Sequence, residues 1–341
     1  MSHSAELAGK AVLITGAAGC IGAWVVRQLR ELGARPVVFD IAENRERLHL
    51  IMPDADSVIW ELGDITDFKR LSEVAETHNI EAIIHLAALQ VPFCKADPVS
   101  STRINVMGSI HILELARQRG ITRLSYASSV AAPAMGENEW LATLYGAHKV
   151  CGEQMATVYW QDWGVPSIGI RPAVIYGPGR DQGMSAAPTI ALMAAEVGEA
   201  YTIPFTGNVG FVYVQDAAER FIAAASRSFE DAHVFDLNGT PSSVTRMLAL
   251  SNKHYPDAAI DATGDPIPFP AEKNSGALEQ LIGLPECRSL EAGIAGTVSC
   301  FQVAKARGID LAAPHEGPDP QALAVEQDAR PEILREALVE P

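Results

Sequence analysis

A glycine-rich turn between an apolar strand and an amphipathic helix limits the fold of this chain more than any other feature. Residues 11–16 (AVLITG) form a short apolar run that ends in glycine, and residues 21–33 carry apolar side chains at helical spacing before a terminating glycine. Residues 36–40 (PVVFD) are again typical of a strand. Together they predict a β-α-β unit, in which a helix connects two parallel strands.

The same alternation continues through the first half of the chain. Further strands are expected over residues 57–62, 82–87, 124–128 and 167–172, and further helices over 67–78, 99–119 and 145–163. Alternating strands and helices require a largely parallel sheet with helices on both faces. We therefore predict an α/β fold with a Rossmann-like, doubly wound parallel sheet.

The first turn also has the spacing of a dinucleotide-binding loop. Residues 15–22 read TGAAGCIG, between a predicted strand and a predicted helix. Glycines there let the backbone approach a ligand closely, so that amide groups at the helix N-terminus can hold a pyrophosphate. The residues expected to contact the cofactor are Gly16, Ala18, Gly19, Cys20, Ile21 and Gly22.

Asp40, which ends the second predicted strand, favours NAD over NADP. A carboxylate at this place accepts hydrogen bonds from the adenosine ribose hydroxyls and repels a 2′-phosphate. Arg45 and Arg47 follow closely and could weaken that preference. Asp64 and Ile65 are expected at the adenine, although Asp64 or the nearby Thr66 could instead cap the next helix.

Beyond about residue 176 the alternation weakens and Pro and Gly become frequent. Short strands are expected over 201–205, 211–216 and 233–239, with a helix over 216–228. These patterns predict a smaller C-terminal substrate-binding lobe. The expected boundaries are 1–176 plus 207–240 for an NAD-binding Rossmann domain whose second segment returns to the main sheet, 177–206 plus 241–311 for the lobe, and 312–341 for an acidic, Pro-containing tail.

Charge and cysteine content exclude several kinds of partner and site. With 42 acidic and 26 basic side chains the formal net charge is −16, which repels nucleic acid and anionic membrane surfaces. The first ten residues contain no apolar signal segment, and no apolar run reaches the roughly 18–20 residues of a membrane span. Five scattered cysteines without a Cys-x-x-Cys pair argue against disulfides and a zinc site. We therefore expect a soluble cytoplasmic protein without a metal.

Tyr145 and Lys149 place a phenol and an ammonium four residues apart, on one face of a predicted helix. A nearby cation stabilises the phenolate and lowers the tyrosine pKa from its usual value of about 10. Tyr145 could then act as a general acid or base on a hydroxyl or carbonyl group. Ser128 and Ser129 end the preceding strand, where a hydroxyl could hydrogen-bond the same substrate oxygen.

These motifs together resemble the extended short-chain dehydrogenase/reductase family, in its NAD-dependent epimerase/dehydratase group. The resemblance covers about residues 9–240 and includes the motifs TGAAGCIG, GDITD, IIHLAA, YASS, YGAHK and RPAVIYGPG. It implies that Ser129, Tyr145 and Lys149 form a catalytic triad, which Asn105 joins through a water relay. The second serine of the pair corresponds to the family's reactive hydroxyl.

The resemblance also implies further cofactor contacts and an assembly. Lys149 would hold the nicotinamide ribose, Tyr145 would also contact the cofactor, and Ala87, Ala88, Pro172 and Val174 would line it. Family members often dimerise through the helices that correspond here to residues 99–119 and 145–163. A homodimer is therefore expected, although the apolar side chains of these helices could equally face the chain's own sheet.

Three departures from the family pattern bear on the substrate. Val130 and Ala131 replace the Asp-Glu pair that drives elimination in the 4,6-dehydratases, so dehydration is disfavoured. Val174 and Val209 stand where nucleotide-sugar enzymes commonly carry an Asn and an Arg for the diphosphate. A UDP-sugar site would need cations for its two phosphates, and this part of the chain has few.

The expected substrate is therefore a small hydroxylated compound, such as a sugar or a sugar acid. Its hydroxyl proton would pass to Tyr145 while a hydride passes to NAD. The residues expected near the substrate, besides Ser129 and Tyr145, are Gln90, Arg180 and Met184. Arg180 could pair with a carboxylate on the substrate or, as a loop residue, with a partner on the protein surface.

Two histidines have expected positions. His148 replaces the serine that is common between the family's tyrosine and lysine, on a segment expected near the substrate. It could face solvent or a dimer interface, and a direct catalytic role is the less favoured alternative. His85 is expected to be a buried, hydrogen-bonded residue of its strand.

Three hypotheses follow for the activity. The first is an NAD-dependent dehydrogenase or reductase, and the second is a (nucleotide-)sugar epimerase that retains NAD between turnovers. The third, an NAD-binding regulatory protein without catalysis, is disfavoured because Ser129, Tyr145 and Lys149 are all present. Val174 and Val209 favour the first hypothesis over the second.

Overall fold

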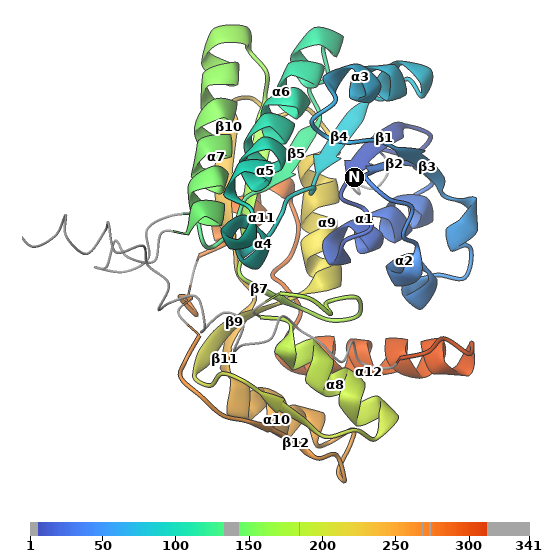
Figure 1. Ribbon diagram of the computed structural model, residues 1–341, viewed down its shortest axis with the longest axis vertical. Helices are drawn as coiled ribbons and strands as arrows, with labels where there is room; N and C mark the ends of the chain where they lie inside the picture. Colours follow the sequence, from blue (N-terminus) through green and yellow to red (C-terminus); the bar gives the residue numbers. More distant parts are fainter. Residues whose placement is uncertain (1–5, 133–142, 184, 268, 273, 312–341) are drawn as a thin grey trace, which may run out of the picture.

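The computed structural model describes residues 6–132, 143–183, 185–267, 269–272 and 274–311. Its main sheet has seven strands in the order β10-β6-β5-β4-β1-β2-β3 (Figure 1). All of its strand pairs are parallel. The strands are β1 (Ala11–Thr15), β2 (Arg35–Asp40), β3 (Ile59–Leu62), β4 (Ala82–His85), β5 (Leu124–Ala127), β6 (Ser167–Pro172) and β10 (Ala232–Leu237). The predicted Rossmann-like α/β fold is confirmed.

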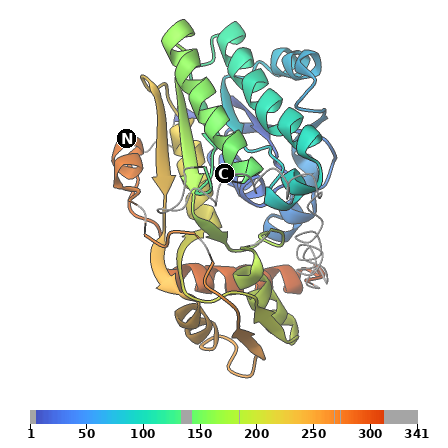
Figure 2. The same ribbon diagram turned by 60° about the vertical axis from the view of Figure 1, so that its left-hand side comes forward.

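Helices cover both faces of this sheet because its strands are apolar on both sides. In β1, Val12 and Ile14 pack into one core with α1 and α9, whereas Ala11 and Leu13 pack into a second core with α3, α6 and α7. These helices are α1 (Cys20–Glu31), α9 (Val214–Ala224), α3 (Phe68–Thr77), α6 (Gly108–Arg119) and α7 (Leu144–Trp163). α6 and α7 lie side by side in both views (Figures 1 and 2).

A smaller lobe lies beyond the carboxyl ends of the strands (Figure 1). It contains a three-stranded sheet of β7 (Val174–Tyr176), β9 (Asn208–Tyr213) and β11 (Thr240–Ser243), and a two-stranded sheet of β8 (Tyr201–Ile203) and β12 (Ile260–Ala262). Its helices are α8 (Ala187–Val197), α10 (Val244–Ser251) and α12 (Leu290–Ala306). Within the described ranges, no helix is both long enough and apolar enough to cross a bilayer.

Shorter helical segments complete the fold. α2 (Glu46–Ile51) and a 3₁₀ turn at Ala55–Ser57 connect β2 to β3, and α11 (Gly276–Ile282) packs beside α9 and β10. Between β4 and α6 the chain forms α4 (Val91–Ala96), α5 (Pro98–Thr102) and a π-helical turn, η3 (Arg103–Met107). The predicted helix over 99–119 therefore corresponds to α5, η3 and α6 in succession.

The expectation that all of residues 207–240 return to the main sheet is wrong for β9. Only β10 joins the main sheet, beside β6, while β9 pairs with β7 and β11. The chain leaves the main sheet after Ala173, whose amide donates to the Leu237 carbonyl (2.9 Å). The helix expected over 216–228 begins earlier, at Val214, and ends at Ala224. The tail expected at 312–341 lies outside the described residues.

Candidate active site

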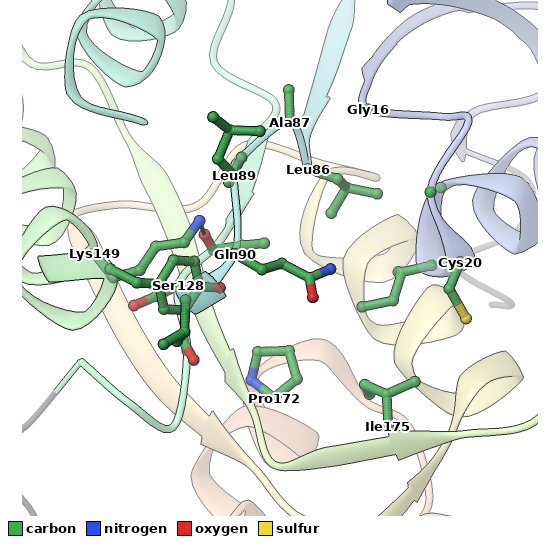
Figure 3. Close-up of a pocket in the computed structure, with 18 of the residues that line it drawn as sticks. Gly16, Cys20, Leu86, Ala87, Leu89, Gln90, Ser128, Lys149, Pro172 and Ile175 are labelled. Atoms are coloured by element: carbon green, nitrogen blue, oxygen red, sulfur yellow. Dashed lines mark hydrogen bonds between the residues drawn. The ribbon is translucent and has the colours of Figure 1, made fainter. Parts of the chain in front are cut away.

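A cavity of about 530 Å³ lies at the carboxyl ends of the central strands, facing the lobe (Figure 3). The strand order reverses between β1 and β4, and ligands of doubly wound folds bind at such a switch point. The cavity is lined by every residue that sequence analysis assigned to the cofactor: Gly16, Ala18, Gly19, Cys20, Ile21, Gly22, Asp40, Asp64, Ile65, Ala87, Ala88, Tyr145, Lys149, Pro172 and Val174. It is also lined by Gln90, Ser129 and Arg180, whereas Met184 lies outside the described residues.

The glycine loop is built for close backbone approach. Gly16 has a φ of +73°, and a Cβ there would lie 2.6 Å from the Ala87 nitrogen at the end of β4. A Cβ on Gly22 would lie 2.5 Å from the Gly16 carbonyl oxygen. Both positions therefore require glycine, because any side chain would push α1 or β4 away from the turn.

The N-terminus of α1 can accept an anion. Gly19 precedes the helix and offers no side-chain cap, so amides of the first turn remain for a ligand. Cys20 is the first residue of the helix, and burial raises the pKa of its thiol to about 12. The thiol is therefore neutral near pH 7 and adds no negative charge beside a pyrophosphate.

Asp40 lines the cavity at the end where an adenosine ribose is expected. Its carboxylate accepts hydrogen bonds from the amides of Ala18 (3.0 Å) and Ile41 (2.8 Å), and burial raises its pKa. Arg45 turns away and donates to the carbonyls of Ala55 and Val58. This arginine therefore does not offset the repulsion that Asp40 would exert on a 2′-phosphate.

Arg47 is also engaged elsewhere. It donates to the Ala18 carbonyl (2.7 Å) and the Gly179 carbonyl (3.0 Å), and it pairs with Asp181 (2.5 Å). It thus connects the glycine loop to the segment that follows β7. The features of this end of the cavity fit NAD: a glycine turn, a helix N-terminus without a cap, and a carboxylate whose neighbouring arginines have other partners.

Asp64 and Ile65 line the cavity. The expectation that Asp64 or Thr66 caps the next helix is wrong. Asp64 is exposed and accepts a hydrogen bond from the Thr66 amide (2.8 Å). The N-cap of α3 is Asp67, whose side chain accepts from the Arg70 amide. Asp64 is therefore not used as the cap of α3.

At the other end of the cavity, Tyr145 lies in the first turn of α7 and Lys149 one turn later. The Lys149 ammonium donates to the Ala127 carbonyl (2.6 Å) and lies 5.5 Å from the centre of the Tyr145 ring. Burial lowers the pKa of Lys149 to about 8. Burial also raises the pKa of Tyr145, which a hydrogen bond with Ser129 and the charge of Arg180 partly offset. Arg180 is therefore a second cation that favours the Tyr145 phenolate, and the expected effect of Lys149 on that phenolate stays a prediction.

The two serines of β5 have different partners. Ser128 is buried and donates to the carboxylate of Glu153, which also accepts two hydrogen bonds from Arg171 (2.5 and 2.7 Å). Ser129 instead faces Tyr145 and accepts a hydrogen bond from the Ala131 amide (3.1 Å). The geometry suits the assignment of Ser129 as the reactive hydroxyl. No role was predicted for Glu153, although it lies four residues after Lys149 and therefore on the same face of α7.

Asn105 lies in the π-helical turn η3 and does not line the cavity. Its amide accepts from the Leu89 nitrogen (2.8 Å), donates to the Leu89 carbonyl (2.9 Å) and lies 3.3 Å from Nδ1 of His148. Asn105 therefore fixes the segment that follows β4, and its water relay stays a prediction. π-turns are frequent at functional sites.

The structure contradicts the expected position of His148 and confirms that of His85. His148 is buried and packs inward, with Nε2 3.0 Å from the Thr102 hydroxyl, so the expectation that it faces solvent or a partner is wrong. His85 is buried, with Nδ1 2.7 Å from the Thr15 hydroxyl, and burial lowers its pKa to about 3. The prediction of a buried, hydrogen-bonded strand residue is confirmed for His85.

Fold and site together define a dinucleotide-binding α/β protein with a tyrosine–lysine pair beside the cofactor cavity. The chain belongs to the NAD dependent epimerase/dehydratase family, whose model matches residues 12–237, and the expected NAD cofactor agrees with this membership. UDP-glucose 4-epimerase from Rhizobium leguminosarum bv. trifolii is 34% identical over 177 residues, which cover 48% of this chain and 52% of that protein. The chain thus matches about half the length of that relative.

Solved structures share the fold over most of the chain. L-threonine dehydrogenase from Clostridium difficile has a TM-score of 0.75 at 22% identity, covering 89% of this chain and 100% of that one. UDP-glucose 4-epimerase from Thermotoga maritima has a TM-score of 0.73 at 23% identity, covering 86% and 99%. Both a dehydrogenase and an epimerase are therefore similar to this chain in fold.

Proposed function

We propose that the protein is an NAD-dependent dehydrogenase that oxidises a secondary alcohol of a small hydroxylated compound, or reduces the corresponding carbonyl. The observation that carries this proposal is the position of Tyr145. Its phenol, the Ser129 hydroxyl and the Lys149 ammonium line the same cavity as the glycine loop. Acid–base groups and a cofactor site in one cavity are what a hydride-transfer reaction requires.

In the oxidation, the phenolate of Tyr145 takes the proton of the substrate hydroxyl. Ser129 donates a hydrogen bond to the substrate oxygen as the C–O bond becomes a carbonyl. NAD, when bound, supplies the acceptor for the hydride that leaves the same carbon. Lys149 holds its ammonium on the Ala127 carbonyl, from which it can reach a ribose hydroxyl of the cofactor.

The residues at the family's diphosphate-binding positions favour a substrate without a nucleotide. Val174 and Val209, which occupy the family positions for a diphosphate-binding Asn and Arg, are both buried and apolar. Val209 lies in β9, 1% exposed, where it packs in the core.

An epimerase that retains NAD is the second candidate. It is favoured by the 34% identity to a UDP-glucose 4-epimerase, a match that covers 48% of this chain. Both activities begin with the same proton and hydride transfers. They differ in whether NADH is released or gives its hydride back to the opposite face of the carbonyl.

One experiment separates the two. Purified protein is mixed with NAD and a panel of free sugars, sugar acids, polyols, hydroxy amino acids and UDP-sugars, and both NADH absorbance and the organic products are measured. The proposal predicts that NADH accumulates with a compound that has no nucleotide. Isomerised UDP-sugar without net NADH would support the epimerase and contradict the proposal.

We also propose that the protein is a homodimer through α5–α6 and α7. These adjacent helices leave large apolar side chains exposed on the outside of the chain, namely Val99 (66%), Met107 (46%), Val158 (45%) and Trp163 (51%). Light scattering of the purified protein should give twice the chain mass of 36.5 kDa. Charged substitutions at Val99 and Val158 should shift it to the monomer.

A further inference from the structure

We propose that Arg180 forms an anion subsite that holds a carboxylate of the substrate, so that the substrates are small hydroxy acids. This inference rests on the proposed dehydrogenase function, because it places the acid next to the reaction centre at Tyr145. It names a substrate class: compounds that carry a secondary hydroxyl and a carboxylate on one short carbon skeleton, including sugar acids and hydroxy amino acids.

The first support is that the Arg180 guanidinium is left without a counter-charge. Its Nε is buried and has no hydrogen-bond partner, and one of its Nη atoms donates to the Ser185 hydroxyl (3.2 Å). Among the described residues, no carboxylate oxygen lies within 4.0 Å of the group, so the surface partner considered from the sequence is not found there. A buried charge without a partner is unfavourable, and a bound anion would remove that cost.

The second support is that the neighbouring acid is already engaged. Asp181 follows Arg180 directly, but its carboxylate pairs with Arg47 on α2 (2.5 and 3.1 Å). Arg47 also donates to the Gly179 carbonyl, so the backbone on the N-terminal side of Arg180 is held as well. The loop is therefore fixed on both sides of Arg180, and the guanidinium stays in the cavity wall without forming an ion pair with Asp181.

The third support is that a glycine at position 183 leaves room for the ends of the Arg180 and Gln90 side chains. Gly183 has a φ of +94°, and a Cβ there would lie 3.1 Å from Nη2 of Arg180 and 2.5 Å from Oε1 of Gln90. A side chain at position 183 would therefore push both groups away. The Gln90 side chain reaches into the cavity between the Lys149 end and Cys20 (Figure 3). The Gln90 atom nearest to Gly183 is the acceptor Oε1, so Gln90 would donate to an anion held by Arg180 only after its amide group turns to present Nε2.

Arg180 and Tyr145 line the same cavity. The charge of Arg180 acts on the phenol of Tyr145 and also on the thiol of Cys20 at the glycine loop. The proposed substrate therefore has its hydroxyl on Tyr145 and its acid on Arg180, with its short carbon skeleton in the cavity between them. Apart from Lys149, Arg180 is the cation here without an acid partner in the described residues. One guanidinium can pair bidentately with a carboxylate, and its single positive charge balances the single negative charge of that group.

The test compares each hydroxy acid with a neutral compound of the same skeleton, such as L-threonine with L-threoninamide and an aldonate with its polyol. NADH formation is measured with wild type, Arg180→Gln and Arg180→Lys. Arg30→Gln is the matched control, because it removes one arginine charge from an exposed ion pair on α1. Circular dichroism and NAD affinity verify that each variant is folded.

We expect wild type and Arg30→Gln to prefer the acid over its neutral analogue. Arg180→Gln should raise the KM for the acid by about tenfold or more while NAD affinity is unchanged, since a charge-assisted hydrogen bond is worth at least that factor. Arg180→Lys should recover part of the loss, because it keeps the charge without the planar fork. Equal use of acids and neutral analogues, or a preference for a phosphorylated compound, would overturn the inference while leaving the dehydrogenase proposal intact.

A binding assay tests the subsite without turnover. The protein is saturated with NADH and titrated with oxamate, a small carboxylate, while the nicotinamide fluorescence is recorded. Binding to wild type that weakens about tenfold or more in Arg180→Gln would support the subsite even if no compound of the panel were oxidised. Absent binding to wild type, or equal binding to both proteins, would overturn it.

Discussion

Ser128 at the end of β5 donates a hydrogen bond to the buried carboxylate of Glu153, one turn of α7 beyond Lys149. Arg171 on β6 completes the arrangement by pairing with the same carboxylate. This network fixes the end of β5 against α7, and the next residue, Ser129, is thereby turned toward Tyr145. We therefore expect Glu153 to position Ser129, the proposed reactive hydroxyl.

Replacing Glu153 by Gln should destabilise the protein and misplace Ser129. The substitution removes the carboxylate that accepts two hydrogen bonds from the partly buried Arg171 and leaves Asp236, 4.0 Å away, so we expect a loss of about 2 kcal/mol in the free energy of unfolding. Urea denaturation measures this loss. The control is Glu73→Gln, whose carboxylate is exposed and lies 3.9 Å from Lys69, with an expected loss below about 1 kcal/mol. Equal effects of the two substitutions would mean that the buried network does not hold the site.

Replacing Asp40 by Ser should relax the preference for NAD. The substitution removes the negative charge that faces the ribose, and Arg45 and Arg47 keep their present partners. The ratio of kcat/KM for NADP to that for NAD should rise about tenfold or more, since charge repulsion of this kind is worth at least 1.4 kcal/mol. An unchanged ratio in steady-state kinetics would show that the carboxylate does not face the ribose.

The buried Lys149 should make the stability of the protein without cofactor depend on pH. Its pKa is lowered to about 8 from an ordinary value of about 10.4, so between these values the folded chain binds one proton fewer than the unfolded chain. Burying the charged ammonium is unfavourable below pH 8, and this cost declines as the pH rises.

The free energy of unfolding of wild type should therefore rise by about 2 kcal/mol relative to Lys149→Met between pH 7 and pH 9.5. Urea denaturation of both proteins at the two pH values measures this difference. A constant difference would mean that Lys149 has an ordinary pKa in the folded chain.

The cofactor end of the site could be predicted from sequence because its signals are local. The glycine spacing and Asp40 lie within one β-α-β unit, and a strand ending in a carboxylate beside such a turn has few other arrangements. The choice of Ser129 over Ser128 came from the family resemblance, and the structure supplies a physical reason in Glu153.

The environment of Arg180 could not be predicted in this way. It depends on the pair of Arg47 and Asp181, which are 134 residues apart in the sequence and meet only once the loop after β7 folds against the glycine loop. The pairing of β9 with β7 and β11 could not be predicted from the sequence either. The apolar pattern of β9 predicts a strand, but long-range packing decides which strands it pairs with.

The most direct test of the account is the rate of hydride transfer in Tyr145→Phe, measured as NADH formation with a substrate found in the panel. The substitution removes the acid–base hydroxyl and leaves the ring. We predict a rate lower by about 100-fold or more, with NAD affinity within about twofold of wild type, because general acid–base groups typically contribute 10²–10⁴-fold. Tyr255→Phe, which removes a hydroxyl bonded to Glu196 in the lobe, should keep the wild-type rate. Unchanged NADH formation by Tyr145→Phe would contradict the assignment of Tyr145 and with it the proposed mechanism.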